Sequence, residues 1–90
     1  MSLAQFIDEP VLVQIRWQAD GAVQPAAFVW RGRTHAIRDV GRQWDEMAGG
    51  DRWRCYLVRT AENETFELRF SAATAAWRLQ RAWLRTTADI

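Results

Sequence analysis

Two side chains of this 90-residue sequence have the chemistry of a base and a nucleophile: the only histidine, His35, and the only cysteine, Cys55. A histidine beside a thiol produces a cysteine nucleophile. Cys55, however, alternates with Trp53 and Leu57 in an apolar pattern, in which a thiol is normally buried and inert. His35 alternates with Ile37, which is typical of a packed or surface histidine. We therefore expect no cysteine–histidine catalysis.

Acidic pairs suited to acid–base chemistry occur at Asp45–Glu46 and at Glu62 with Glu64. Both lie in segments expected to be loops or turns, in which carboxylates are usually just solvated. No glycine-rich phosphate-binding motif is present. A single cysteine cannot form an internal disulfide, and no second cysteine is available for a zinc site of the usual four-ligand kind. We expect a protein that is not an enzyme and that uses no cofactor or metal.

Arginine alternates with aromatic residues at three places, which favours binding over catalysis. All twelve basic residues are arginine. Arg31 and Arg33 flank Gly32, which allows close backbone approach to a phosphate; residues 52–54 and 77–83 repeat the mixture. Rings that stack on bases beside guanidinium groups are typical of single-stranded nucleic-acid binding. The predicted nucleic-acid-binding residues are Trp30, Arg31, Gly32, Arg33, Arg52 and Arg54.

The charge balance keeps a second class of function open. Eleven acidic residues leave a net charge of only +1, so any positive surface must arise from folding. GC-rich coding also enriches arginine and tryptophan, and a glycine turn with solvated arginines explains the bend equally. The alternative is a protein–protein interaction or self-association module, such as a homodimer formed through a strand edge or a tryptophan patch, with no nucleic-acid contact.

The elements that must position these residues are predicted to be strands. Residues 11–17, 34–40, 52–60 and 65–70 alternate apolar and polar side chains, and residues 26–30 form an apolar extended run in which Phe28 and Trp30 share a face. In the first of these strands, the residues expected to share a face are Val11, Val13, Ile15 and Trp17. Residues 52–60 and 65–70 are expected to form a hairpin, with Phe66 and Leu68 facing inward and Glu67 facing outward. The tryptophans are expected to line the inside of the sheet. The turn signals between the strands are Asp20-Gly21, Arg31-Gly32-Arg33 and residues 61–64. The periodicity lapses over residues 41–51, where we expect a loop with a helical turn around Trp44.

The segment 71–84 fits two patterns. Alanines at 72, 75, 76 and 82 form a helical stripe with Leu79 and Trp83, whereas Trp77, Leu79 and Trp83 alternate as in a strand. Propensity alone favours a helix. The order of elements predicts a small twisted antiparallel sheet that curls toward a barrel, with about five to six strands.

Composition predicts one domain over residues 1–90, with its core at about 11–84. The sequence is 49% hydrophobic and 26% charged, which is typical of a globular domain and not of a disordered tail. No apolar run is long enough to cross a bilayer, and the first ten residues carry Asp8 and Glu9 where a signal peptide would be basic and then apolar. We expect a cytoplasmic protein with no membrane partner.

A resemblance to a known family rests on five segments: Phe28-Val29-Trp30-Arg31-Gly32-Arg33-Thr34-His35-Ala36-Ile37, Val40 with Trp44, residues 52–60, Phe66-Glu67-Leu68 and Trp77-Arg78-Leu79. They are similar to an uncharacterised family of small bacterial domains. That family carries a Phe-x-Trp-Arg-Gly-Arg bend, a later tryptophan, an Arg-x-Tyr-x-Val-x-Thr strand, a Tyr/Phe-Glu-Leu strand and a closing Trp-x-Leu strand. The match covers roughly residues 11–84.

The resemblance implies an all-β domain whose last segment, 71–84, is a strand. Members of the family occur alone or attached to proteins that resemble Y-family translesion DNA polymerases. This implies a place in DNA repair or damage tolerance, with DNA or a DNA-repair protein as the partner. No catalytic residue carries over. The family's glycine-containing turn is replaced here by Glu62-Asn63-Glu64, which leaves the geometry of that hairpin open.

Overall fold

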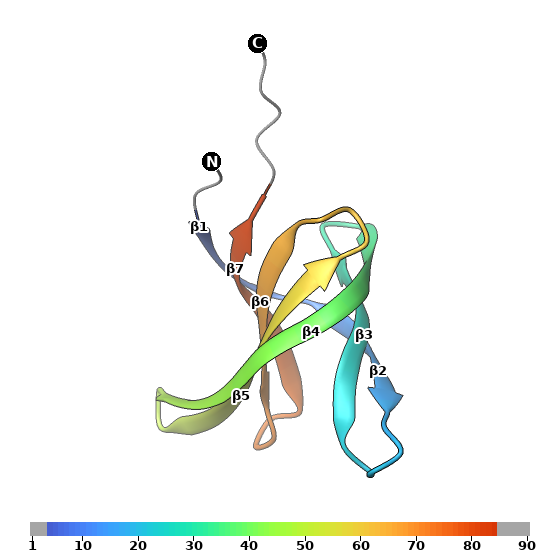
Figure 1. Cartoon of the computed structure of the whole chain (residues 1–90). Coiled ribbons are helices and arrows are strands. Elements are labelled where there is room, and N and C mark those ends of the chain that lie inside the picture. Colours follow the sequence, from blue (N-terminus) through green and yellow to red (C-terminus); the bar gives the residue numbers. More distant parts are fainter. Residues whose placement is uncertain (1–3, 85–90) are drawn as a thin grey trace.

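The computed structural model describes residues 4–84, which form one open, curled antiparallel sheet without helices (Figure 1). The strand order across the sheet is β1-β7-β6-β5-β4-β3-β2. The prediction of an all-β, curled antiparallel sheet is confirmed, with seven strands in place of five or six. No helix in the described part of the chain is suited to crossing a membrane. The strands are β1 (Ala4–Pro10), β2 (Leu12–Trp17), β3 (Val23–Trp30), β4 (Arg33–Ala48), β5 (Asp51–Thr60), β6 (Thr65–Ser71) and β7 (Ala76–Trp83).

The first two strands lie at opposite edges of the sheet although only Val11 separates them along the chain. Strand β1 pairs with β7, and β2 pairs with β3. The backbone N–H of Val11 donates to the carbonyl of Trp77 at 3.3 Å, which holds the junction against β7. Because one continuous segment supplies both edges, the sheet must curl (Figure 1). Strand β1 was not predicted from the sequence.

Strand β4 corrects the expectation of a loop over residues 41–51. Its first residues pair with β3, and the rest pair with β5 from Ile37 as far as Ala48. The register shifts between Ile37 and Asp39 and again between Val40 and Gln43. Each shift changes the phase of the alternation. The alternation of apolar and polar residues is therefore not continuous in the sequence of β4, although the strand itself is.

Strand β7 settles the ambiguous last segment as a strand, and the helical alternative is wrong. The register passes from Leu79 opposite Leu68 to Arg81 opposite Glu67, so Gln80 is an extra residue in β7. This bulge lets both Leu79 and Ala82 face the core, which produces the helix-like spacing. Burial of these two side chains outweighs the helix propensity of the alanines.

The core lies inside the curl. Phe28 and Phe66 pack edge to face with their ring centroids 5.0 Å apart. The buried cluster consists of Phe28, Trp30, Tyr56, Val58, Phe66, Leu68, Leu79 and Ala82. Inward packing of Phe66 and Leu68 was predicted correctly. The expectation that the tryptophans line the core holds for Trp30 but is wrong for Trp17, because the far end of the β2–β3 hairpin extends past the core and leaves Trp17 70% exposed.

Two turns show how the sequence closes its hairpins. Arg31 and Gly32 are the two turn residues between β3 and β4, and both have positive φ, at 51° and 77°. That conformation matches the twist of the two flanking strands. The bend predicted at this point is confirmed. In the turn between β5 and β6, Asn63 takes a positive φ of 67°, which asparagine tolerates better than most residues other than glycine.

Candidate functional site

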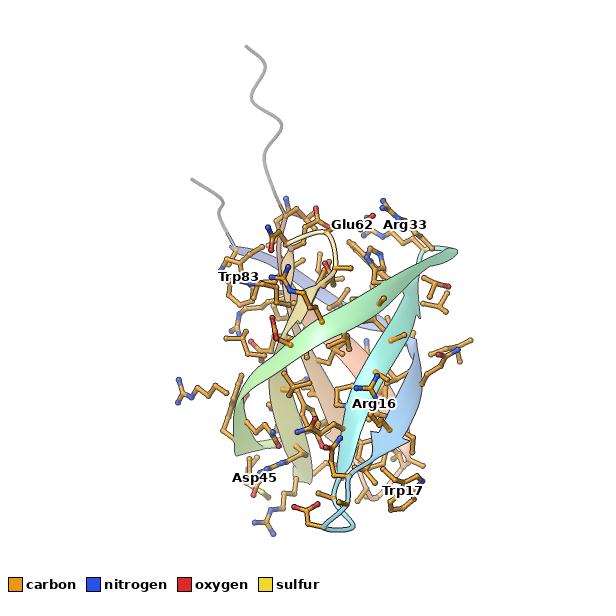
Figure 2. The ribbon with its side chains drawn as sticks, turned by 45° about the vertical axis from the view of Figure 1, so that its right-hand side comes forward. Arg16, Trp17, Arg33, Asp45, Glu62 and Trp83 are labelled. Atoms are coloured by element: carbon orange, nitrogen blue, oxygen red, sulfur yellow. The ribbon has the colours of Figure 1, made fainter. Side chains whose placement is uncertain are left out.

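The residues predicted to bind nucleic acid lie in two separate groups. Trp30, Arg31, Gly32 and Arg33 lie at the turn between β3 and β4, whereas Arg52 and Arg54 lie at the start of β5. Figure 2 shows Arg33 beside Glu62 at one end of the molecule and Asp45, the acidic partner of the second group, at the other end. The structure does not bring the two groups together.

Each guanidinium group of the first set has a carboxylate partner. Arg31 pairs with Glu9 at 2.8 Å and stacks on the Trp30 ring at 4.5 Å. The indole Nε1 of Trp30 donates to the same Glu9 carboxylate at 2.9 Å. Hydrogen bonds from Arg31, and then from Trp30, lower the pKa of Glu9. Arg33 forms an ion pair with Glu62. Trp30 is buried, so its ring is not free to stack on a base.

The second set converges on one carboxylate. Arg52 and Arg54 pair with Asp45 at 3.1 and 3.2 Å. Arg54 also donates to the side-chain oxygen of Gln43 at 3.1 Å. The hydrogen bond from Arg54 is the largest cause that lowers the pKa of Asp45. All four predicted arginines therefore already have acidic partners, which favours solvated ion pairs over a free basic surface at these positions.

Arginines without a carboxylate partner within 4.0 Å, among the described residues, are Arg16, Arg42 and Arg59. Arg42 and Arg59 border two hollows on the face of β4–β7 that points away from the core. One hollow of about 430 Å³ is lined by Arg42, Trp44, Leu57, Thr65, Glu67 and Trp83. Its neighbour of about 240 Å³ is lined by Asp39, Gly41, Leu57, Val58, Arg59 and Thr65. Because Leu57 and Thr65 line both, the two hollows form one surface, which we call the outer groove.

Strand register positions the outer groove. Tyr56 and Val58 of β5 face the core, so Leu57 between them faces outward. Leu57 lies opposite Glu67, which in turn lies opposite Arg81. The next pair along the strands, Thr65 and Trp83, lies on the same face. The Gln80 bulge makes this possible, since it turns Arg81 and Trp83 outward although Leu79 and Ala82 face the core.

The floor of the groove carries a buried carboxylate. Glu67 is only 3% exposed, and its Oε1 accepts a hydrogen bond from Arg81 at 2.8 Å. Glu67 was predicted to face outward, and it does, but the groove walls and the Arg81 side chain cover it. An ion pair with Arg81 compensates the burial of this charge. Arg42 and Arg59 remain available to a ligand.

The walls of the groove carry aromatic surface. Trp44 and Trp83 line it and are both half-buried, so part of each ring faces solvent. The guanidinium of Arg42 lies over the Trp44 ring at 5.2 Å. Two indoles beside two unpaired guanidinium groups suit an anion that carries flat rings. These groove residues were not predicted from the sequence. The two β4 bulges interrupt the alternation around Trp44, and neither Arg42 nor Arg59 is next to an aromatic residue in the sequence.

The structure does not bring His35 and Cys55 together as a base and a nucleophile. The His35 ring stacks on Phe28 inside the core at 4.9 Å, whereas Cys55 lies on the opposite face of β5 from Tyr56. Cys55 is fully buried, as expected, and burial raises the pKa of its thiol to about 11. The thiol therefore stays protonated near pH 7 and is not a nucleophile.

The fold and the groove define a small all-β domain with an open polar and aromatic outer surface. The chain belongs to the family described as Domain of unknown function (DUF6504), whose family model matches residues 1–88. No curated protein and no solved structure matches the chain.

Proposed function

We propose that this domain is a non-catalytic binding module whose outer groove takes single-stranded nucleic acid. The observation that carries the proposal is the meeting of Arg42 and Arg59, which have no acidic partner in the described chain, with the half-exposed rings of Trp44 and Trp83. Bases stack on the two indoles, and the guanidinium groups contact the phosphates between them. The other charges near the groove are already neutralised, Glu67 by Arg81 and Asp39 by Arg38.

The number of free guanidinium groups sets the expected salt dependence. Two phosphate contacts predict a slope of about −1.4 for the logarithm of the association constant against the logarithm of the salt concentration. Affinity then falls roughly sevenfold between about 50 and about 200 mM salt. This is weak salt dependence for a nucleic-acid-binding protein and agrees with the net charge of only +1.

Fluorescence anisotropy with a labelled single-stranded DNA oligonucleotide tests the proposal. We expect Trp44→Ala to weaken binding roughly tenfold or more through loss of stacking, and Arg42→Ala with Arg59→Ala to flatten the salt dependence. Arg52→Ala is the matched control, because that arginine is paired with Asp45 outside the groove, and it should leave affinity unchanged. Absence of binding at low salt, or equal losses in the groove variants and the control, contradicts the proposal.

The biological setting follows from the family resemblance. We propose that the domain acts in the bacterial cytoplasm as an accessory module of DNA repair, holding unpaired template or displaced strand beside a polymerase-like protein. A duplex oligonucleotide is the informative comparison, since stacking on Trp44 and Trp83 requires unpaired bases. Equal affinity for duplex and single strand contradicts the stacking role.

A second candidate function is protein interaction through the edge strand β2. Three large apolar side chains on this strand are exposed, Leu12 at 75%, Ile15 at 45% and Trp17 at 70%. Within residues 4–84, β2 pairs with β3 alone, which leaves its other edge free for strand addition. Sedimentation velocity tests this function. Self-association supports it if Trp17→Ser abolishes the association and salt does not weaken it. A protein that stays monomeric at high concentration, at every salt concentration, opposes self-association.

A further inference from the structure

Three metal-ligating side chains meet at the end of the sheet opposite the β4–β5 turn. His35 comes from the start of β4, and Glu62 and Glu64 come from the turn between β5 and β6. One ligand atom from each lies within 4.8 Å of the other two. A hollow of about 320 Å³ opens beside them and is lined by Trp30, Arg31, Arg33, His35, Glu64 and Leu84. This cluster is separate from the outer groove, with which it shares no lining residue.

Aromatic packing holds the imidazole of His35 in place, and its side chain makes no hydrogen bond within residues 4–84. The side chain is 5% exposed, and its ring lies 4.9 Å from Phe28, 5.3 Å from Phe66 and 6.1 Å from Trp30. Its Nδ1 is buried and has no partner among the described residues. A buried polar atom without a partner is costly, so packing alone does not account for histidine at this position.

The two glutamates are placed by backbone hydrogen bonds of their own turn. The carbonyl of Glu64 accepts from the backbone N–H of Thr60 at 2.9 Å, and the backbone N–H of Glu64 donates to Thr60 Oγ1 at 3.3 Å. The N–H of Ala61 donates to the carbonyl of Ala36 at 3.0 Å, which ties the turn to β4 beside His35. The three side chains therefore sit on a braced hairpin end, as a preorganised site requires.

We propose that His35, Glu62 and Glu64 bind one Zn²⁺ ion, with an open coordination position facing the hollow. One imidazole nitrogen and two carboxylate oxygens are a ligand set that zinc takes, and three protein ligands with one open position are typical of an exchangeable zinc site. Mg²⁺ and Ca²⁺ prefer oxygen ligands throughout, so the imidazole disfavours them. The two carboxylates balance the charge of the ion.

Arg33 is the group with which zinc must compete. It pairs with Glu62 at the surface, where the two side chains are 63% and 51% exposed. Exposed ion pairs contribute little free energy, so zinc displaces Arg33 from Glu62 at small cost.

Calorimetric titration of the full chain with ZnCl₂ near pH 7 tests the site. We expect one Zn²⁺ per chain and no heat with MgCl₂. Glu64→Gln and Glu62→Gln should each weaken zinc binding roughly 10- to 100-fold, because the amide keeps the shape and removes the charge. Glu46→Gln is the matched control: it neutralises another exposed carboxylate, from the cluster with Cys55 and Glu67, and should leave zinc affinity unchanged.

His35→Ala is not a clean test, because it also removes a ring from the core and could unfold the protein. Two-dimensional NMR of the His35 ring avoids this problem, because it observes the ligand in the folded chain. We expect the His35 ring resonances to shift on addition of zinc in the original chain, and to need a roughly 10- to 100-fold higher zinc concentration for the same shift in Glu64→Gln. Unshifted His35 resonances, full zinc affinity in both glutamine variants of the turn, or loss of zinc binding in Glu46→Gln would overturn the site.

Discussion

At the scale of single residues, one carboxylate joins two distant parts of the chain. Glu9 of β1 accepts hydrogen bonds from the Trp30 indole at 2.9 Å and from Arg31 at 2.8 Å. It therefore fixes the N-terminal strand to the turn between β3 and β4. Arg31 was predicted to contact a phosphate, but in the structure its guanidinium binds Glu9, 22 positions away. No local pattern predicts such a pair.

The pH dependence of stability should report this contact. The pKa of Glu9 is lowered in the folded chain from an ordinary value of 4.5, so its contribution to stability is present above that value and is lost as the pH falls through the folded-state pKa. We expect the free energy of unfolding to fall less steeply on acidification in Glu9→Gln than in the original chain. Urea titrations at several acidic pH values measure this; parallel curves for the two proteins refute it.

At the scale of elements, the turn between β3 and β4 depends on a backbone conformation that only glycine adopts freely. Gly32 has a φ of +77°, and a Cβ there would meet no atom within 4 Å. We expect Gly32→Ala to lower the free energy of unfolding by about 1–2 kcal/mol through backbone strain alone. Gly41→Ala is the control, since Gly41 has no positive φ and its Cβ would make an ordinary contact with the Leu57 carbonyl at 3.5 Å. Denaturant unfolding compares the two; equal losses would show that strain is not the cause.

Bulges explain which elements the sequence predicted well. Residues 52–60 and 65–70 pair without a register shift, and both were predicted as strands that form a hairpin. Strand β4 carries two bulges and β7 carries one, and these two strands contain the expected loop and the ambiguous segment. An extra residue in a strand reverses which side chains face inward. Its position depends on the partner strand, so the pattern of one strand cannot locate it.

At the scale of the whole molecule, a single core formed by β3, β5, β6 and β7 holds the curled sheet together. Leu68→Ala removes a side chain with no exposed surface and should cost about 2–5 kcal/mol. Leu12→Ala removes the same atoms from a residue that is 75% exposed, and it should change stability by less than about 0.5 kcal/mol. Chemical denaturation followed by tryptophan fluorescence measures both; similar losses would contradict the placement of the core.

The candidate sites belong to this whole-molecule scale. The outer groove unites Arg42 and Trp44 of β4 with Trp83 of β7, and the proposed zinc site unites His35 with a turn that begins 26 positions later. In the sequence, Glu62 and Glu64 are recognisable as an acidic pair, but His35 stands apart from them. Spacing along the chain did not connect them, because only the pairing of β4 with β5 brings the turn beside His35.

The sequence by itself determined the all-β class, the hairpin of β5 and β6, the tight turn at Arg31 and Gly32 and the burial of Cys55. These follow from local alternation and from backbone preferences, which act over a few residues. Only the tertiary structure decided which arginines meet carboxylates, which tryptophans stay exposed and which side chains share a site. Such contacts join residues far apart in sequence, and they depend on register, bulges and the curl of the sheet.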